Sequence, residues 1–253
     1  MLWYKAWLET RWRFLTGLVL CIASCGVVIF TQPLTENMQI SIPDLGAELN
    51  KMVQEALRLA STYPGYVWSQ WFGKNLLQLW MFFAVIIGVG GVVAEGARGS
   101  AQWTLSLPVT RRRLFGVRAG MGAAELLALA VVPSLFIPLF SRSIGKSYPV
   151  SEVLIYSLIL FVGGLSVYCL ALLLSTIFAE QLKAIIIGVV LVFGVSLLPL
   201  FDARLTPYMV ATLMSGQEYF KTGALPWAAL AAYTALAVAL YMLALRVLER
   251  RDF

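Results

Sequence analysis

Long apolar runs dominate the pattern of the chain. Between short clusters of polar and charged residues lie six stretches that are free of charged side chains or, in one case, carry Glu125 alone. A helix needs roughly 20 apolar residues to cross the hydrocarbon core of a bilayer. The pattern therefore predicts an all-α membrane protein, because barrel strands would give short alternating segments instead. The six predicted spans are residues 14–35, 75–94, 119–140, 153–178, 184–200 and 226–245.

Two segments outside these runs have helical patterns of their own. In residues 1–13, Lys5, Glu9 and Arg13 are spaced four apart on one face, and aromatic residues fill the opposite arc. This pattern is typical of a helix at the membrane interface; the alternative is a cytoplasmic extension of the first span. Between the last two spans, the sequence predicts short external helices. One of them has Thr206 as N-cap, Pro207 as first helical residue and Tyr208 to Met214 as its body, and it ends at Gly216. A surface loop is the alternative there.

Composition and charge support one membrane domain. Hydrophobic residues make up 60% of the 253 residues and charged ones 13%, whereas soluble domains average about 45–50% and about 25%. We expect residues 1–253 to form a single transmembrane domain. With both termini in the cytoplasm, twelve of the 19 Lys and Arg residues fall inside and seven outside, as the positive-inside rule requires. The formal net charge of +6 then reflects topology, and no nucleic-acid partner is needed to explain it.

The chain offers little for catalysis. It has no histidine, and its three cysteines are too few to predict a metal site. Glu125 is the only ionisable residue well inside a span, so it is a candidate for the translocation path. The "GKS" at 145–147 lacks the glycine that a phosphate-binding loop needs five residues earlier, where Phe140 stands. We expect no enzyme and no nucleotide site in this chain.

The segment after the second span, "EGARGSAQWTLSLPVTRRRLFG", is the most informative part of the sequence. Residues 95–106 can form only a weak helix, because two glycines interrupt it, and Trp103 and Leu105 offer apolar contacts. Pro108 breaks the segment, and Thr110 predicts the N-cap of the third span. The three arginines that follow oppose the helix dipole. Anionic lipid, an acidic partner or the topology rule can favour them.

This segment resembles the first cytoplasmic loop of ABC-2 type transporter permeases. The acid of the family pattern corresponds to Glu95, its glycines to Gly96 and Gly99, and its central motif to "TLSLPVTR" at 104–111. One departure is that Arg118, preceded by Val117, follows Gly116 where the family often has lysine. The final "LERRDF" and the layout of six spans with an interfacial helix are also similar to the family.

The resemblance implies the membrane-spanning permease subunit of an ATP-driven exporter in the bacterial inner membrane. Two permease subunits, identical or homologous, would pair above two ATPase subunits, which would bind ATP and Mg; this chain would hold no cofactor. Residues 95–118 would form the coupling segment. The residues expected to contact the ATPase are Glu95, Gly96, Arg98, Gly99, Gln102, Trp103, Thr104 and Leu105. Those expected to form the hinge and the start of the third span are Pro108, Thr110, Arg111, Arg112 and Arg113.

The cargo and the energy source leave alternatives open. Aromatic-rich spans with almost no charge favour an amphiphilic or apolar cargo such as a lipid, peptide or drug. A second hypothesis is a stand-alone carrier driven by an ion gradient, with Glu125 as the proton or sodium site. A third is a membrane scaffold or sensor subunit that pairs with an ATPase and moves no cargo.

Overall fold

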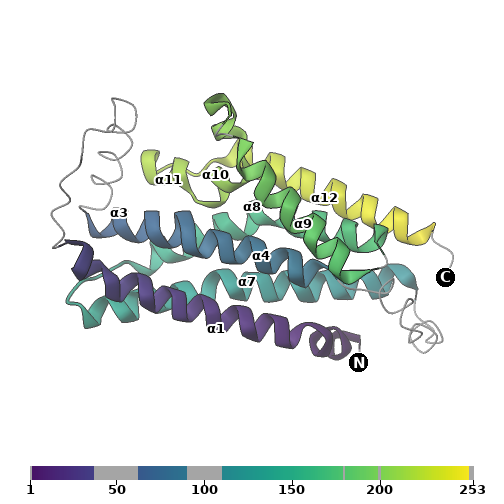
Figure 1. Cartoon of the computed structure of the whole chain (residues 1–253), viewed down its shortest axis with the longest axis horizontal. Helices are drawn as coiled ribbons and strands as arrows, with labels where there is room; N and C mark the ends of the chain where they lie inside the picture. Colours follow the sequence, from purple (N-terminus) through teal and green to yellow (C-terminus); the bar gives the residue numbers. More distant parts are fainter. Residues whose placement is uncertain (1, 37–61, 90–109, 179, 199–200, 251–253) are drawn as a thin grey trace.

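The long helices lie side by side along the molecule (Figure 1). The computed structural model describes residues 2–36, 62–89, 110–178, 180–198 and 201–250, and within these ranges the chain is helical with no strand. The predicted all-α class is confirmed for this part. Five helical segments there are long and apolar enough to cross a membrane, as in a multi-pass membrane protein. They are α1 (Leu2–Glu36), the continuous helix Tyr63–Gly88, α7 (Arg111–Ser143), α8 (Val150–Ile177) and α12 (Trp227–Glu249).

The fifth expected span, at 184–200, corresponds to a shorter helix. Helix α9 (Gln181–Ser196) has 16 residues, and at about 1.5 Å per residue it is about 24 Å long, less than the roughly 30 Å of a hydrocarbon core. One face packs inward through Ala184, Gly188 and Val192, which are buried at a spacing of four. Six full spans therefore stay a prediction.

Helix α1 does not divide where the sequence pattern predicted. Instead of an interfacial helix at 1–13 followed by a span at 14–35, one helix runs from Leu2 to Glu36. No proline or glycine lies between Leu2 and Thr16 to break it. The polar face of its first turns also contacts α7 and α4, as described below. The observed arrangement is the alternative, an extension of the first span.

The second span begins earlier than its apolar run. The run predicted a start at residue 75, but the helix starts at Tyr63, as α3 (Tyr63–Val67), continues through a π-helical stretch (Trp68–Asn75) and ends as α4 (Leu76–Gly88). Asn75 is accommodated because its side-chain amide donates to the Gln70 carbonyl at 2.7 Å. The predicted end of this span, at 90–94, lies outside the described residues.

Helix α8 occupies the centre of the bundle and packs against α4, α7, α9 and α12. The indole of Trp80 on α4 is fully buried against Gly164 of α8, and its Nε1 donates to the Leu126 carbonyl of α7 at 2.9 Å. Glycine thus permits close helix packing at this position, as expected of small residues in membrane helices.

Short helical segments connect α9 to α12, but their boundaries differ from the prediction. The chain forms a 3-10 helix (Ala203–Tyr208), then α10 (Val210–Met214) and α11 (Gln217–Thr222). Asp202, not Thr206, caps the first of them, by accepting from the Arg204 amide at 2.9 Å. Gly216 ends α10 in the left-handed region at φ 66°, a conformation that glycine adopts without steric cost.

Candidate functional site

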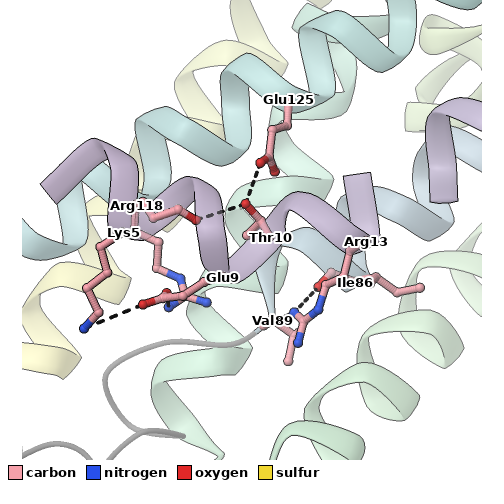
Figure 2. A network of polar contacts seen from close by, with 9 residues as sticks. Lys5, Glu9, Thr10, Arg13, Ile86, Val89, Arg118 and Glu125 are labelled. Atoms are coloured by element: carbon pink, nitrogen blue, oxygen red, sulfur yellow. Dashed lines mark hydrogen bonds and ion pairs between the residues drawn. The ribbon is translucent and has the colours of Figure 1, made fainter. Parts of the chain in front are cut away.

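Polar side chains gather where the first turns of α1 meet α4 and α7 (Figure 2). We call this group the N-terminal polar cluster. Its members are Lys5, Glu9, Thr10 and Arg13 on α1, Arg118 and Glu125 on α7, and the backbone carbonyls of Ile86 and Val89 at the end of α4. Helical periodicity explains the grouping, since residues four apart on α1 and seven apart on α7 share a face.

An ion pair and a hydrogen bond join α1 to α7. Arg118 Nη1 lies 2.9 Å from Glu9 Oε2, and Lys5 Nζ lies 3.7 Å from the other oxygen of Glu9. Two turns further along α7, Glu125 Oε1 accepts from Thr10 Oγ1 at 2.5 Å. The residues that the amphipathic pattern assigned to the membrane surface therefore make contacts within the protein.

Arg13 joins α1 to α4. Its Nη1 donates to the carbonyls of Ile86 at 2.9 Å and Val89 at 2.7 Å. The last carbonyls of a helix have no partner within the helix and carry its partial negative charge. A guanidinium at this position therefore satisfies two of them and stabilises the C-terminal end of α4 electrostatically.

Glu125 is a buried carboxylate with spare hydrogen-bonding capacity. Its residue is 3% exposed, and its second oxygen, Oε2, is buried without a partner among the described residues, as is Nε of Arg118. Arg118 and Arg13 interact with it electrostatically. Buried polar atoms in native proteins are usually hydrogen-bonded. An oxygen without a protein partner, such as Oε2, can accept a hydrogen bond from water or carry a proton. Such a group inside a predicted span is a candidate functional site.

The cluster lies beside the predicted coupling segment, residues 95–118, most of which falls in the stretch 90–109. Val89 is the last described residue before that stretch and Thr110 is the first after it. Arg13 donates hydrogen bonds to the end of α4, which precedes residues 90–109. Glu9 and Thr10 contact α7, which follows them. The first turns of α1 therefore connect the two helices between which residues 90–109 run.

The structure reaches only part of the predicted coupling site. Glu95, Gly96, Arg98, Gly99, Gln102, Trp103, Thr104, Leu105 and Pro108 lie outside the described residues. Thr110 is the N-cap of α7, as predicted, and its hydroxyl accepts from the Arg113 amide at 3.3 Å. Arg112 forms an ion pair with Glu249 near the end of α12, using two nitrogens against the two carboxylate oxygens. Arg111 is half-buried and Arg113 is exposed.

The predicted outer-mouth residues lie on the 3-10 helix. Thr206 and Pro207 line a cavity of about 510 Å³ together with Glu218 and Lys221. Tyr208 is 74% exposed, and its carbonyl accepts from the Tyr233 hydroxyl of α12. No contact links these residues to the N-terminal polar cluster within the described ranges.

Metal ligands are sparse in the described ranges. They contain no group of three or more His, Cys, Asp or Glu side chains that could hold a metal ion, and Cys21, Cys25 and Cys169 are buried free thiols.

A scan against protein-family models gave no match, and searches of curated proteins and of solved structures also found none.

Replacing Arg13 with glutamine should loosen the end of α4. The variant loses both bonds to the carbonyls of Ile86 and Val89, and the free energy of unfolding should fall by about 1–3 kcal/mol, measured by denaturant titration in detergent micelles. Arg11→Gln is the matched control, because it removes the same charge from the same helix, and it should cost less than about 1 kcal/mol. Equal losses in the two variants would contradict the capping role.

Proposed function

We propose that the chain is the membrane-spanning permease subunit of an ATP-driven exporter of the ABC-2 type. The observation that carries the proposal is the segment 95–118, whose acid, glycines and "TLSLPVTR" motif fall between two long apolar helices. On this proposal two such subunits pair in the bacterial inner membrane, with both termini in the cytoplasm. Two separate ATPase subunits bind ATP and Mg and contact residues 95–106.

The N-terminal polar cluster gives this proposal a mechanical basis. When the ATPase subunits close on ATP, they displace the coupling segment, and the ends of α4 and α7 move with it. Arg13 links α1 to the first of these helices, and Glu9 and Thr10 link it to the second. A displacement of the coupling segment therefore moves α1, α4 and α7 together.

An apolar cavity supports an amphiphilic or apolar cargo. It has a volume of about 330 Å³, within the range of about 300–1,000 Å³ that is typical of ligand pockets. Side chains of α8, α9 and α12 line it, and Tyr208 and Met209 line its end near the short helices. None of the described residues that line it is charged, and a highly charged cargo would lose its hydration there without compensation.

The ATPase encoded nearest to this gene provides the test. Co-expressed with this chain, it should co-purify, and its ATP hydrolysis should rise when the permease is present. The double variant Glu95→Ala with Trp103→Ala should lower that stimulation by about tenfold or more, within the range of about 5–150-fold that is typical of coupling between sites. The spans should remain folded.

The matched control is Glu218→Ala with Trp227→Ala. It makes the same two substitutions at the opposite end of the bundle, where Glu218 is exposed and Trp227 is 71% exposed. Stimulation should stay unchanged in the control. A coupling variant that binds and stimulates the ATPase normally would refute the role of residues 95–106.

The buried oxygen of Glu125 favours a second candidate, a carrier driven by an ion gradient. A carboxylate with an unpartnered oxygen can take up and release a proton or contribute to a sodium site. On this alternative the chain would transport without an ATPase.

A further inference from the structure

A cavity of about 380 Å³ lies at the end of the bundle opposite the N-terminal polar cluster. It opens between the start of α3, the connection from α7 to α8, the first turns of α8, and α11. Four aromatic side chains and one carboxylate are among the lining residues: Tyr148, Glu152, Tyr156, Tyr219 and Phe220. We call it the aromatic cavity. Nothing in the proposed coupling or cargo path uses it.

Contacts with other aromatic rings fix the orientation of the aromatic side chains that line the cavity. The rings of Tyr156 and Tyr219 meet nearly at right angles, with centroids 5.3 Å apart and an interplanar angle of 77°. Tyr156 stacks on Phe72 at 4.8 Å, and Phe220 stacks on Trp68 at 4.3 Å. The walls are therefore preorganised, which lowers the entropic cost of binding a ligand between them.

Among the described residues that line the cavity, Glu152 supplies the only charge. Its Oε1 accepts from the Tyr219 hydroxyl at 3.2 Å. Burial raises the pKa of the Tyr148 hydroxyl, and the neighbouring Tyr156 and Glu152 raise it further, so this phenol is neutral at physiological pH. The cavity therefore combines one negative carboxylate with the electron-rich faces of neutral aromatic rings, and both attract a cation.

A cation–π contact is present beside this cavity. Lys146 Nζ lies 5.4 Å from the ring centroid of Tyr63, and that ring packs edge-on against Tyr148 at 6.4 Å. Aromatic residues at a membrane interface ordinarily anchor a helix in the headgroup region. Anchoring alone does not explain rings that line one cavity together with a carboxylate.

We propose that the aromatic cavity binds an organic ammonium cation, with a quaternary ammonium group as the preferred ligand. Quaternary ammonium groups are recognised by aromatic cages, and they carry no N–H groups that would need hydrogen-bond acceptors. A metal ion such as Ca²⁺ takes 6–8 oxygen ligands, and the cavity offers one carboxylate beside its phenol oxygens. The same chemistry can come from a soluble amphiphile or from a phosphocholine headgroup.

The test titrates dodecyltrimethylammonium into the purified full chain in an uncharged sugar detergent, followed by calorimetry. The control ligand is the uncharged analogue in which carbon replaces nitrogen. The cation should bind at least about tenfold more tightly than the analogue, which corresponds to about 1.4 kcal/mol. Equal binding of the two ligands would overturn the proposal.

Variants assign the binding to this cavity. Glu152→Gln should weaken cation binding by about tenfold or more, and Tyr219→Leu by about 2–30-fold, the range expected of a cation–π contact. Tyr219→Phe keeps the ring and should stay within about threefold of the native chain. Glu218→Gln, which removes the neighbouring carboxylate on α11, should leave binding unchanged. Unaltered binding in Glu152→Gln, or an equal loss in Glu218→Gln, would place the cation elsewhere.

Two further arms identify the source of the ligand. Micelles doped with phosphatidylcholine should suppress binding of the soluble cation if the natural occupant is a lipid headgroup, and micelles doped with diacylglycerol should not. Equal binding in both identifies a soluble ammonium amphiphile. The assay uses the permease chain alone, so its failure would leave the coupling to an ATPase untouched. Conversely, if this chain failed to stimulate an ATPase, the result of the cation-binding assay would be unaffected.

Discussion

Gly164→Ala should be among the most destabilising single substitutions in the bundle. An added Cβ would lie 2.2 and 2.4 Å from two ring atoms of Trp80 and 2.9 Å from Cε of Met214. The indole cannot swing away without breaking its 2.9 Å bond to the Leu126 carbonyl, and it is fully buried. Overpacking and the lost bond together should lower the free energy of unfolding by about 3 kcal/mol or more.

The measurement is unfolding in mixed micelles by increasing denaturing detergent, with the folded fraction followed by tryptophan fluorescence. Gly194→Ala is the matched control, because Gly194 lies within α9 and, its own helix backbone apart, no atom of the described residues lies within 4 Å of the added Cβ. Alanine favours a helix over glycine by roughly 0.5–1 kcal/mol, so the control should be as stable as the native chain or slightly more so. Similar losses in both variants would show that close packing at Gly164 is not the cause.

The sequence predicted which segments form helices better than where the helices begin and end. Long apolar runs identified α7, α8 and α12, because hydrophobicity over about 20 residues is a property of the segment itself. The start of the second helix was missed because the charge of Lys74 ends the uncharged run just before Asn75. The helix continues past this point with the Asn75 side chain bonded to the Gln70 carbonyl and with Trp71 and Phe72 buried.

The candidate sites show the same division between local and tertiary information. Glu125 stood out in the sequence as the only charge in its run, and Thr110 as an N-cap, since both are local signals. The partners of Glu125 could not be predicted, because Thr10 is 115 residues away. The amphipathic pattern of the first turns identified a polar face, but it did not distinguish a face toward water from one toward α7.

The aromatic cavity left a signal in the sequence that was overlooked. Tyr148, Glu152 and Tyr156 are spaced four apart, which places them near one another where the chain enters α8. The opposite wall, Tyr219 and Phe220, comes from α11, and no local pattern predicts that it faces these residues. The coupling motif remains a sequence-based prediction, since residues 90–109 lie outside the described ranges.

Glu125→Lys should have a second large effect, this time through charge. Native Glu125 is buried beside Thr10 and interacts with Arg118 and Arg13. A lysine there would add an unpaired positive charge near two others, and such a change typically costs about 3–5 kcal/mol. Little folded protein should accumulate in membranes, as measured by size-exclusion chromatography of fluorescently tagged chain. Glu180→Lys, at an exposed carboxylate near the start of α9, should change stability by less than about 1 kcal/mol.

Glu125→Gln separates the two energy sources because it keeps the shape of the side chain and removes the titratable group. The amide oxygen can still accept from Thr10, so the helices should stay joined. If transport is driven by an ATPase, proteoliposomes that contain both proteins should keep cargo movement within about threefold of the native level, and the permease alone should move none. If Glu125 carries the coupling ion, the permease alone should transport under an imposed proton or sodium gradient, and Glu125→Gln should abolish that transport. We expect the first result, because the N-terminal polar cluster uses Glu125 to fasten α7 to α1, and glutamine preserves that bond.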